Sequence, residues 1–413
     1  MTKRAGIRRP SRSAGDPYGL GPVGTYIAPI LAAVALVIIA VVTFGLLGGK
    51  LPFKGGSGTT NGPARTPAPP NVVLPEPQVT FPGSIAYAKA GNIWVQTGKD
   101  VRQLTTTGND SMPTFSADGK WIYFVRQELG RGLFVPGNGR RNMYDLATPS
   151  VERVVADGSA PPEQILVGDF STSRSQWFYW IRQPVPSPDG RTIALVSDGP
   201  DPTKNDVVLQ TYDTKTKKLT KAKVPESAPL GHQDPAWRPD GQQLLFVKNG
   251  RDGTKGAPQI VRYSPANGKM STMTGPGYLA PAWSPDGRYV AATRTTSFGT
   301  DVVILDAGTG AELVRLTSDG HSFSPAWSPA GDAVAFLRLS GQIVDLDMAK
   351  LSGASGAWTV AQTVPLTQVS GLDGASRPSW FVPASLLPAP SASPSALAPS
   401  GSGGPSGSSS ASP

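Results

Sequence analysis

A seven-residue pattern that recurs through the middle of this 413-residue chain constrains its fold more than any other feature. The fullest copy reads Pro-Ala-Trp-Ser-Pro-Asp-Gly at residues 281–287. Six copies of varying completeness begin at Pro113, Pro184, Pro235, Pro281, Pro325 and Pro378. The intervals between these prolines are 71, 51, 46, 44 and 53 residues. A period of about 40–50 residues is typical of propellers and solenoids.

The pattern within each repeat favours a propeller blade. A short first strand leads into Asp-Gly, which is a strong hairpin signal. In the repeat that begins at Pro281, further strands are expected at residues 289–293, 301–306 and 313–317. In the first complete repeat, the third strand is expected at residues 142–146. Four short antiparallel strands without a helical period make one blade of an all-β propeller.

The two ends of the repeat region complete each other. Residues 84–88, 92–96 and 101–105 have the pattern of the second, third and fourth strands of a blade, whereas residues 378–382 resemble a first strand alone. Together they would form one blade, close the ring and remove its open edges. Five complete repeats and this composite blade predict a six-bladed β-propeller of four-stranded antiparallel blades over residues 81–384.

The repeat resembles that of TolB-type six-bladed propellers, which also occurs in the propeller domains of prolyl-oligopeptidase-like enzymes. The resemblance extends over about residues 81–384 and departs where Pro186 replaces the aromatic residue, where Ala330 replaces Asp, and in the truncated copy at Pro378. It implies a propeller fold and, because TolB-type propellers act in envelope protein complexes, a binding role. A TolB carries an additional N-terminal domain where this chain has an apolar segment.

That apolar segment predicts a membrane anchor. Residues 26–47 contain no charged side chain over 22 residues, and a spanning helix needs about 20. We therefore expect one N-terminal transmembrane helix, a signal anchor, at residues 26–48. A cleaved signal peptide is the alternative, but its apolar core would be about 7–15 residues long. Residues 1–25 carry a charge of +4, which predicts a cytoplasmic N-terminus and places the rest of the chain on the extracytoplasmic side of the cell membrane.

Two low-complexity segments flank the repeat region. Residues 49–80 are rich in Pro and Gly and are expected to form a stalk between the membrane and the propeller. Residues 385–413 consist almost entirely of Ser, Pro, Ala, Gly and Leu. This composition cannot bury enough apolar surface to offset the entropy of ordering, so a disordered tail is expected.

Charge and cysteine content exclude several classes of function. The formal net charge is +9, of which +4 falls in residues 1–25, +2 in residues 50–80 and +3 in the rest of the chain. A nucleic-acid surface needs a basic stripe, so no nucleic-acid partner is expected. The absence of Cys excludes disulfides, thiolate metal ligands and cysteine nucleophiles.

The loops that enter the first strands contain the best polar candidates for a site. Such loops ring one mouth of the central channel of a propeller. They include both histidines of the chain, His232 and His321, together with Asp234 and Tyr278. A shared site at this mouth is one interpretation, and a surface or hydrogen-bonding role for each histidine is the alternative. The Asp-Gly pairs are interpreted as turn residues and the motif aromatics as core residues.

The longest interval contains an aromatic insertion. Residues 177–180 read Trp-Phe-Tyr-Trp, and alternate residues of a strand point to opposite sides. We expect Trp177, Tyr179 and Trp180 to contribute to a partner surface beside the mouth loops. A local lid packed against the blade rim is the alternative.

These features favour binding over catalysis. The sequence contains no nucleophile elbow, no His-Glu-x-x-His motif and no phosphate-binding glycine loop, and no cofactor is expected. The expected function is a membrane-anchored binding module in the cell envelope that docks a protein, peptide or polymer ligand. The alternative is a propeller enzyme, similar to a lactonase or lyase, with a metal ion in its channel.

Overall fold

The computed structural model describes residues 81–134, 139–173, 175–224, 231–249 and 258–387. The predicted cytoplasmic segment 1–25, membrane helix 26–48 and stalk 49–80 lie outside the described residues, as does the tail from residue 388 onward. None of the helices in the described ranges has the length and apolar character that crossing a membrane requires.

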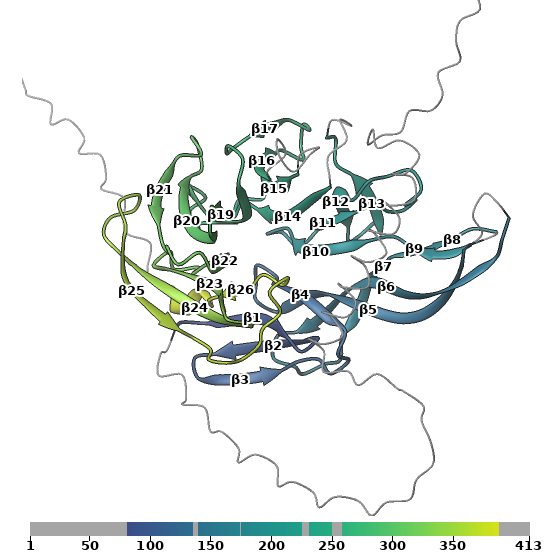
Figure 1. Ribbon diagram of the computed structural model, residues 1–413, viewed down its shortest axis with the longest axis horizontal. Coiled ribbons are helices and arrows are strands. Elements are labelled where there is room, and N and C mark those ends of the chain that lie inside the picture. Colours follow the sequence, from purple (N-terminus) through teal and green to yellow (C-terminus); the bar gives the residue numbers. More distant parts are fainter. Residues whose placement is uncertain (1–80, 135–138, 174, 225–230, 250–257, 388–413) are drawn as a thin grey trace, which may run out of the picture. The chain divides into compact units, whose positions relative to one another are not determined.

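The described residues form six four-stranded antiparallel sheets arranged as the blades of a ring (Figure 1). From the channel outward, blade 1 contains β26 (Ser379–Phe381), β1 (Ser84–Lys89), β2 (Asn92–Thr97) and β3 (Asp100–Gln103). Blade 2 contains β4 (Asp110–Phe115), β5 (Trp121–Phe134), β6 (Asn142–Val155) and β7 (Glu163–Val167). Blade 3 contains β10 (Ile181–Pro186), β11 (Thr192–Ser197), β12 (Val208–Asp213) and β13 (Lys218–Lys221).

The remaining blades repeat this order. Blade 4 contains β14 (His232–Trp237), β15 (Leu244–Lys248), β16 (Gln259–Tyr263) and β17 (Met270–Thr272). Blade 5 contains β18 (Tyr278–Trp283), β19 (Tyr289–Thr296), β20 (Gly299–Asp306) and β21 (Glu312–Arg315). Blade 6 contains β22 (Ser322–Trp327), β23 (Ala333–Ser340), β24 (Ile343–Ser352) and β25 (Thr359–Pro365). A hairpin of β8 (Asp169–Ser171) and β9 (Gln176–Phe178) precedes blade 3, and a 3₁₀ turn, η1 (Ala384–Leu386), follows β26.

The composite blade that the sequence predicts is confirmed. β26 pairs with β1 in an antiparallel register that places Ser84 opposite Phe381 and Ala86 opposite Ser379. The ring is therefore closed by only three residues of the C-terminal strand. The all-β six-bladed fold is confirmed with it.

Each apolar core lies between two neighbouring blades rather than within one. There are six such clusters in the described part of the chain, one at each blade boundary. In β15, Leu244 and Phe246 face blade 3, whereas Leu245 and Val247 face blade 5. This division follows from the two-residue period of a strand. It explains why the second strand of every repeat is apolar on both faces.

The motif tryptophans belong to these cores, as expected from their spacing. Trp283 is 9% exposed, and its indole Nε1 donates a hydrogen bond to the carbonyl oxygen of Ala236 in the preceding blade. Trp237 likewise donates to Val185 across the boundary between blades 4 and 3. Trp237 and Trp283 thus pack against the preceding blade and pair their indole N–H there, whereas the buried indole N–H of Trp327 has no such partner.

The Asp-Gly pairs are turn residues, as the sequence predicts. In the fullest copy, the carboxylate of Asp286 accepts hydrogen bonds from the hydroxyl of Ser284 and the backbone N–H of Arg288. In the copy where Ala330 replaces Asp, the hydroxyl of Ser328 donates to Asp332 instead. A carboxylate two positions later therefore compensates for the missing turn residue.

The six residues that directly precede the repeat prolines tie the inner strands together. We call this set the pre-proline ring: Met112, Gln183, Asp234, Ala280, Ser324 and Arg377. The first five adopt left-handed φ angles of +47° to +56° at β-bulges. This conformation is costly for residues other than Gly. It allows several of their amides to bond across a blade boundary.

Those amides form a relay around the channel. The N–H of Asp234 donates to Gln183 Oε1 at 2.7 Å, and the N–H of Ala280 donates to Asp234 Oδ2 at 3.1 Å. Because Ala280 offers no side-chain acceptor, the N–H of Ser324 donates to Thr293 Oγ1 instead. The pre-proline ring therefore links consecutive blades by hydrogen bonds on the channel side, in addition to the apolar cores.

Arg377 completes this ring by reaching to the opposite blades. Its guanidinium donates to the carbonyl oxygens of Pro281 at 2.7 Å and Pro235 at 3.0 Å, in blades 5 and 4. Arg377 itself precedes β26 of blade 1. Burial lowers the pKa of Arg377 and attraction to Asp234 raises it, but a guanidinium stays charged in proteins. The closing strand is thus fastened to the far side of the ring.

We therefore expect Arg377→Met to destabilise the propeller by about 2–4 kcal/mol, because two buried carbonyl oxygens lose a charged donor. Urea unfolding monitored by tryptophan fluorescence measures this loss. Arg191→Met is the matched control, since the Arg191 side chain is 84% exposed in a long ion pair and its removal should change stability by less than about 0.5 kcal/mol. Equal stability of the two variants would show that Arg377 does not fasten the ring.

Candidate functional site at the propeller mouth

The two ends of the propeller differ in what they carry. We define the mouth as the end where each inner strand begins and where the second strand of a blade turns into the third. The opposite end carries the Asp-Gly turns. Both ends of the propeller chain also lie there, because Trp380 near the C-terminal end donates its indole N–H to the carbonyl of Pro82 near the N-terminal end. Within the described residues, the propeller chain therefore begins and ends at the face opposite the mouth.

An arm extends from the mouth side of blade 2 (Figure 1). β5 and β6 are each 14 residues long and pair continuously from Trp121 opposite Val155 to Phe134 opposite Asn142. We define the arm as residues 127–134 and 142–149. The third strand predicted at residues 142–146 is confirmed as part of β6, but β6 continues to Val155, so its first half lies in the arm and residues 150–155 lie in the blade. The apolar spacing of the sequence does not reveal this extension.

The aromatic insertion packs beside the arm. The ring of Tyr144 meets Trp177 edge-to-face at 5.4 Å, Trp177 stacks on Phe178 at 5.5 Å, and Phe178 meets Trp180 edge-to-face at 5.2 Å. Trp177 lies in β9 and is partly buried, whereas Trp180 is 45% exposed. The structure therefore brings Trp177 and Trp180 to the mouth in one rigid row of four aromatic rings.

Tyr179 does not share this surface. Its side chain is 5% exposed, packs in the core between blades 2 and 3, and donates its hydroxyl to the carbonyl oxygen of Val167 at 2.7 Å. Burial raises the pKa of Tyr179 to about 12. The expectation that Tyr179 contributes to a partner surface is thus corrected, because the chain turns this residue inward between its exposed neighbours.

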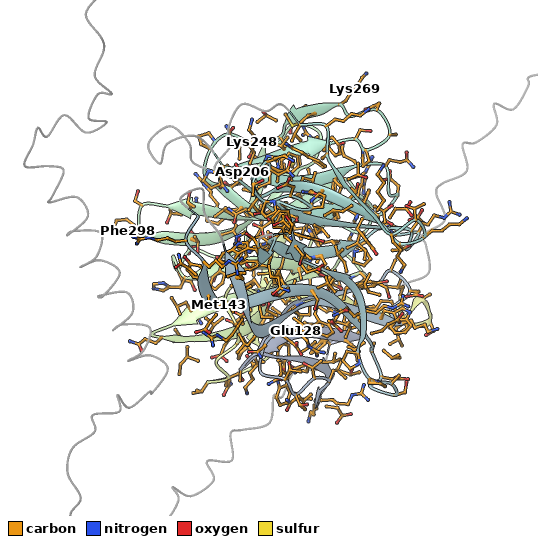
Figure 2. The ribbon with its side chains drawn as sticks, turned by 90° about the vertical axis from the view of Figure 1, so that its right-hand side faces the viewer. Glu128, Met143, Asp206, Lys248, Lys269 and Phe298 are labelled. Carbon is orange, nitrogen blue, oxygen red and sulfur yellow. The ribbon has the colours of Figure 1, made fainter. Side chains whose placement is uncertain are left out.

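Exposed apolar side chains gather at the mouth. Among the described residues, ten large apolar side chains are exposed, and seven of them lie at this end: Leu129, Met143, Tyr144, Trp180, Phe298, Leu339 and Val369. Figure 2 shows Met143 and Phe298 toward the same side of the propeller. Phe298, at the turn between β19 and β20, is 91% exposed. Such asymmetry is typical of interaction faces rather than of scattered surface residues.

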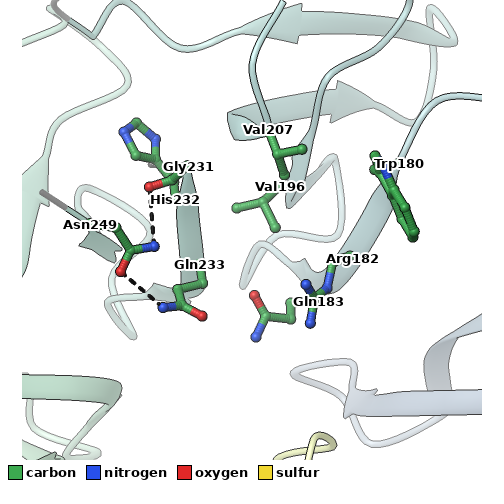
Figure 3. A pocket seen from close by; sticks show the side chains of 9 residues that line it. All are labelled: Trp180, Arg182, Gln183, Val196, Val207, Gly231, His232, Gln233 and Asn249. Atoms are coloured by element: carbon green, nitrogen blue, oxygen red, sulfur yellow. Dashed lines mark hydrogen bonds between the residues drawn. The ribbon is translucent and has the colours of Figure 1, made fainter. Parts of the chain in front are cut away.

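A cavity of about 210 Å³ opens at the mouth between blades 3 and 4 (Figure 3). Trp180 and Arg182 lie on the blade 3 side, and His232 and Asn249 lie on the blade 4 side. Val196 and Val207 lie between them in the view of Figure 3. Trp180 and His232, which the sequence singled out separately, are thus brought to one cavity.

His232 has a structural role beside this cavity. It is 5% exposed, contacts the ring of Phe246, and accepts a hydrogen bond at Nδ1 from the backbone N–H of Leu209 at 3.0 Å. In the neutral ring the proton is therefore on Nε2. Burial, and then the charges of nearby lysines, lower the pKa of His232 to about 4.

The other polar candidates lie apart from one another. Asp234 belongs to the pre-proline ring, where Gln183 and the amide of Ala280 occupy its two carboxylate oxygens. Tyr278 is partly buried beside Glu312 in blade 5. His321 is exposed at the start of blade 6, so all of blade 5 separates it from His232. A shared site of the two histidines is therefore not formed.

Two features of the surface were missed by the sequence analysis. Arg182, Gln233 and Asn249 line the cavity, but nothing in the repeat marks these positions. A run of five lysines between residues 215 and 223 was hidden by the low total charge of the repeat region. This run surrounds β13, the outermost strand of blade 3, where lysines protect an open edge from pairing with other chains.

The alternative function, a propeller enzyme with a metal ion in its channel, requires a cluster of metal ligands. No group of three His, Asp or Glu side chains that could hold a metal ion occurs among residues 81–387 outside the gaps given above. Fold and site together define the class of the protein as a six-bladed β-propeller with an apolar mouth and a small polar cavity.

Comparison with known proteins identifies the kind of propeller. Residues 162–357, from the end of blade 2 into blade 6, match the family of the TolB beta propeller domain. Over these residues the propeller is similar to TolB beta propeller domains. A comparison with curated protein sequences found no match.

Solved structures share the fold at low sequence identity. TolB from Acinetobacter baumannii is 20% identical with a TM-score of 0.51, and the match covers 72% of this chain and 66% of that one, just under two thirds. A putative TolB from Agrobacterium tumefaciens is 15% identical with a TM-score of 0.51, covering 73% and 94%. A chain of a Nidogen/Laminin complex is 10% identical with a TM-score of 0.50, covering 72% and 97%.

We expect His232 to make the propeller sensitive to acid. Because its pKa is lower in the folded than in the unfolded state, where it is about 6.5, the unfolded state binds more protons between about pH 4 and 6.5. The free energy of unfolding should therefore fall by about 1–3 kcal/mol as the pH falls through this window. Asp347 acts oppositely, since burial raises its pKa to about 6. Variants must therefore be compared with the parent at each pH.

Urea unfolding at pH 7 and pH 4.5 tests this contribution. His232→Asn keeps a hydrogen-bond acceptor and should lose less stability between the two pH values than the parent protein. His321→Asn, at the exposed histidine, should follow the parent. If His232→Asn keeps the full acid sensitivity, the buried histidine is not its source.

Proposed function

We propose that this TolB-type propeller is a binding module that docks a protein partner on its mouth, and that it acts by binding rather than by catalysis. The observation that carries the proposal is the gathering of seven exposed large apolar side chains at the mouth. The opposite end carries the polar Asp-Gly turns. Exposed aromatic and methionine side chains surrounded by polar groups resemble the core and rim of a protein interface.

The construction of the mouth supports a partner of considerable size. The arm and the aromatic row project from blade 2, whereas Phe298 projects from blade 5. Rigid aromatic rings lose little conformational entropy when they are covered, so they are efficient contact residues. The pre-proline ring holds these elements on a scaffold that need not rearrange on binding.

We further propose that residues 26–48 anchor the propeller on the extracytoplasmic side of the cell membrane. The apolar run of 22 residues and the charge of +4 before it support this topology. The described propeller chain begins at the face opposite the mouth, so the connection to residues 49–80 leaves the propeller from that face. The TolB resemblance adds a role in an envelope protein complex.

The docking proposal predicts that Leu129→Ser combined with Met143→Ser weakens partner binding at least ten-fold, because both exposed side chains lie on the arm. Cross-linking of the membrane-embedded protein in its own envelope, followed by quantification of captured protein, measures this effect. The matched control is Val101→Ser with Leu313→Ser, which removes apolar side chains of the outer strands β3 and β21. Both variants should keep the parent melting temperature within about 2 °C. Equal capture by both would place the interface elsewhere.

The topology proposal predicts that a protease added to intact cells releases the propeller from the membrane. Cleavage should fall within residues 49–80, because this Pro- and Gly-rich segment has no apolar period that would bury it. A cytoplasmic protein detected in the same cells serves as the control for lysis. Protection of the propeller in intact cells, with cleavage only after lysis, would reverse the proposed topology.

A further inference from the structure

The cavity between blades 3 and 4 has an unbalanced charge. Of the described side chains that line it, Arg182 is the only ionised one, and none is an Asp or Glu. His232 is neutral at physiological pH because burial lowers its pKa to about 4. A cavity with one guanidinium and no carboxylate attracts an anionic group.

Arg182 also differs from three arginines at this end that carboxylates bind. Arg126 is bound by Asp110, Arg294 by Glu312 and Arg338 by Asp319. Within the described part of the chain, the side chain of Arg182 makes no hydrogen bond or ion pair, and it is exposed. A planar guanidinium matches the two oxygens of a carboxylate, so a carboxylate is the anion that its free donors favour in a protein partner.

The rest of the cavity is suited to a compact apolar group. Trp180 forms one wall, and its backbone N–H donates a hydrogen bond to Asp198 Oδ1 at 2.6 Å, which holds the backbone from which the indole projects. Val196 and Val207 add apolar surface. The volume of about 210 Å³ lies below the 300–1,000 Å³ typical of sites for larger small molecules, so the cavity accommodates a group of about one residue.

The polar groups opposite Arg182 favour a peptide over a sugar. Gln233 Nε2 donates to Asn249 Oδ1 at 3.2 Å, and Asn249 Nδ2 donates to the carbonyl of Gly231 at 3.3 Å. These amides are already engaged with each other and with the backbone. An acidic sugar would require several additional partners for its hydroxyl groups, whereas an apolar side chain next to a carboxylate would not.

We propose that this cavity binds the C-terminal residue of a partner polypeptide, with Arg182 pairing with the terminal carboxylate and Trp180 covering the apolar side chain. Capture of a chain terminus is a known mode of peptide recognition. The proposal deepens the proposed function, because it rests on a protein partner that docks on the mouth. It adds the feature of the partner that the cavity recognises.

Binding of short probes to the full chain in detergent micelles tests the proposal. The probes are N-acetyl dipeptides that end in Ala, Leu or Phe, each as the free acid and as the C-terminal amide, together with glucuronic acid. Isothermal titration gives the Kd of each. At least one free acid should bind, and its amide should bind at least ten-fold more weakly, because the charged partner of Arg182 is lost.

Matched variants assign the binding to the cavity. Arg182→Gln should weaken the free acid at least ten-fold and leave the amide unchanged, whereas Arg191→Gln, at an exposed arginine on the opposite end, should change neither. Trp180→Leu should weaken acids ending in Phe more than those ending in Ala. Melting temperatures near that of the parent verify the fold of each variant.

Four results would overturn the proposal: no free acid binds, acid and amide bind equally, Arg182→Gln binds like the parent, or glucuronic acid binds more tightly than every dipeptide. The last result would assign the cavity to an acidic sugar. The docking function fails separately, because it is tested by the arm residues Leu129 and Met143, which do not line this cavity. If the arm variant loses partner capture and no free-acid dipeptide binds the parent protein, the docking function is retained and the carboxylate site is rejected.

Discussion

The hydrogen bonds of the pre-proline ring are the interaction on which the rest of the propeller depends. Six apolar cores also hold neighbouring blades together, one at each blade boundary. In the pre-proline ring, five residues accept left-handed backbone conformations at a cost of about 1–3 kcal/mol each. In return, amides such as those of Asp234 and Ala280 find partners in the preceding blade. Leaving these amides without hydrogen-bond partners would cost a comparable free energy, so the hydrogen bonds offset the strain of the left-handed backbone.

This arrangement separates the scaffold from the connections that can be extended. Inter-blade contacts join the strands and also the bases of the mouth loops, as where the N–H of Asp110 donates to the carbonyl of Gly91 and the N–H of His232 to the carbonyl of Val207. Blade 2 can therefore lengthen β5 and β6 to 14 residues without disturbing the core that Phe124 and Tyr123 form with the neighbouring blades. Binding residues on a rigid scaffold are commonly placed in such connections. The position of the arm is thus a consequence of where the fold tolerates insertion.

The division between a repeated scaffold and connections that differ from blade to blade explains what could be predicted from the sequence. The motif positions that Trp283 and Asp286 occupy recur because the aromatic residue packs between blades and the aspartate caps a turn in successive repeats. This recurrence predicts the blades, their number and their closure. Residues that act in one blade only carry no repeated signal. Arg182 and Asn249 lie in neighbouring blades and meet only through the packing of those blades, so no local pattern joins them. Tyr179 was misassigned because the turn of the chain between β9 and β10, rather than a continuous strand, decides which way it points.

Scaffold and candidate site are nevertheless built from adjacent residues. Gln183 belongs to the pre-proline ring and lines the cavity together with its neighbour Arg182, while in the next blade Asp234 belongs to the ring and Gln233 lines the cavity. Both pairs lie at a β-bulge, and neighbouring residues of a strand point in different directions. The side-chain bond from Gln183 Nε2 to Asp234 Oδ1, at 2.5 Å, therefore also sets the separation of the two cavity walls. A ligand that enters finds these walls already fixed by the bonds that close the ring, so little conformational entropy remains to be lost on binding.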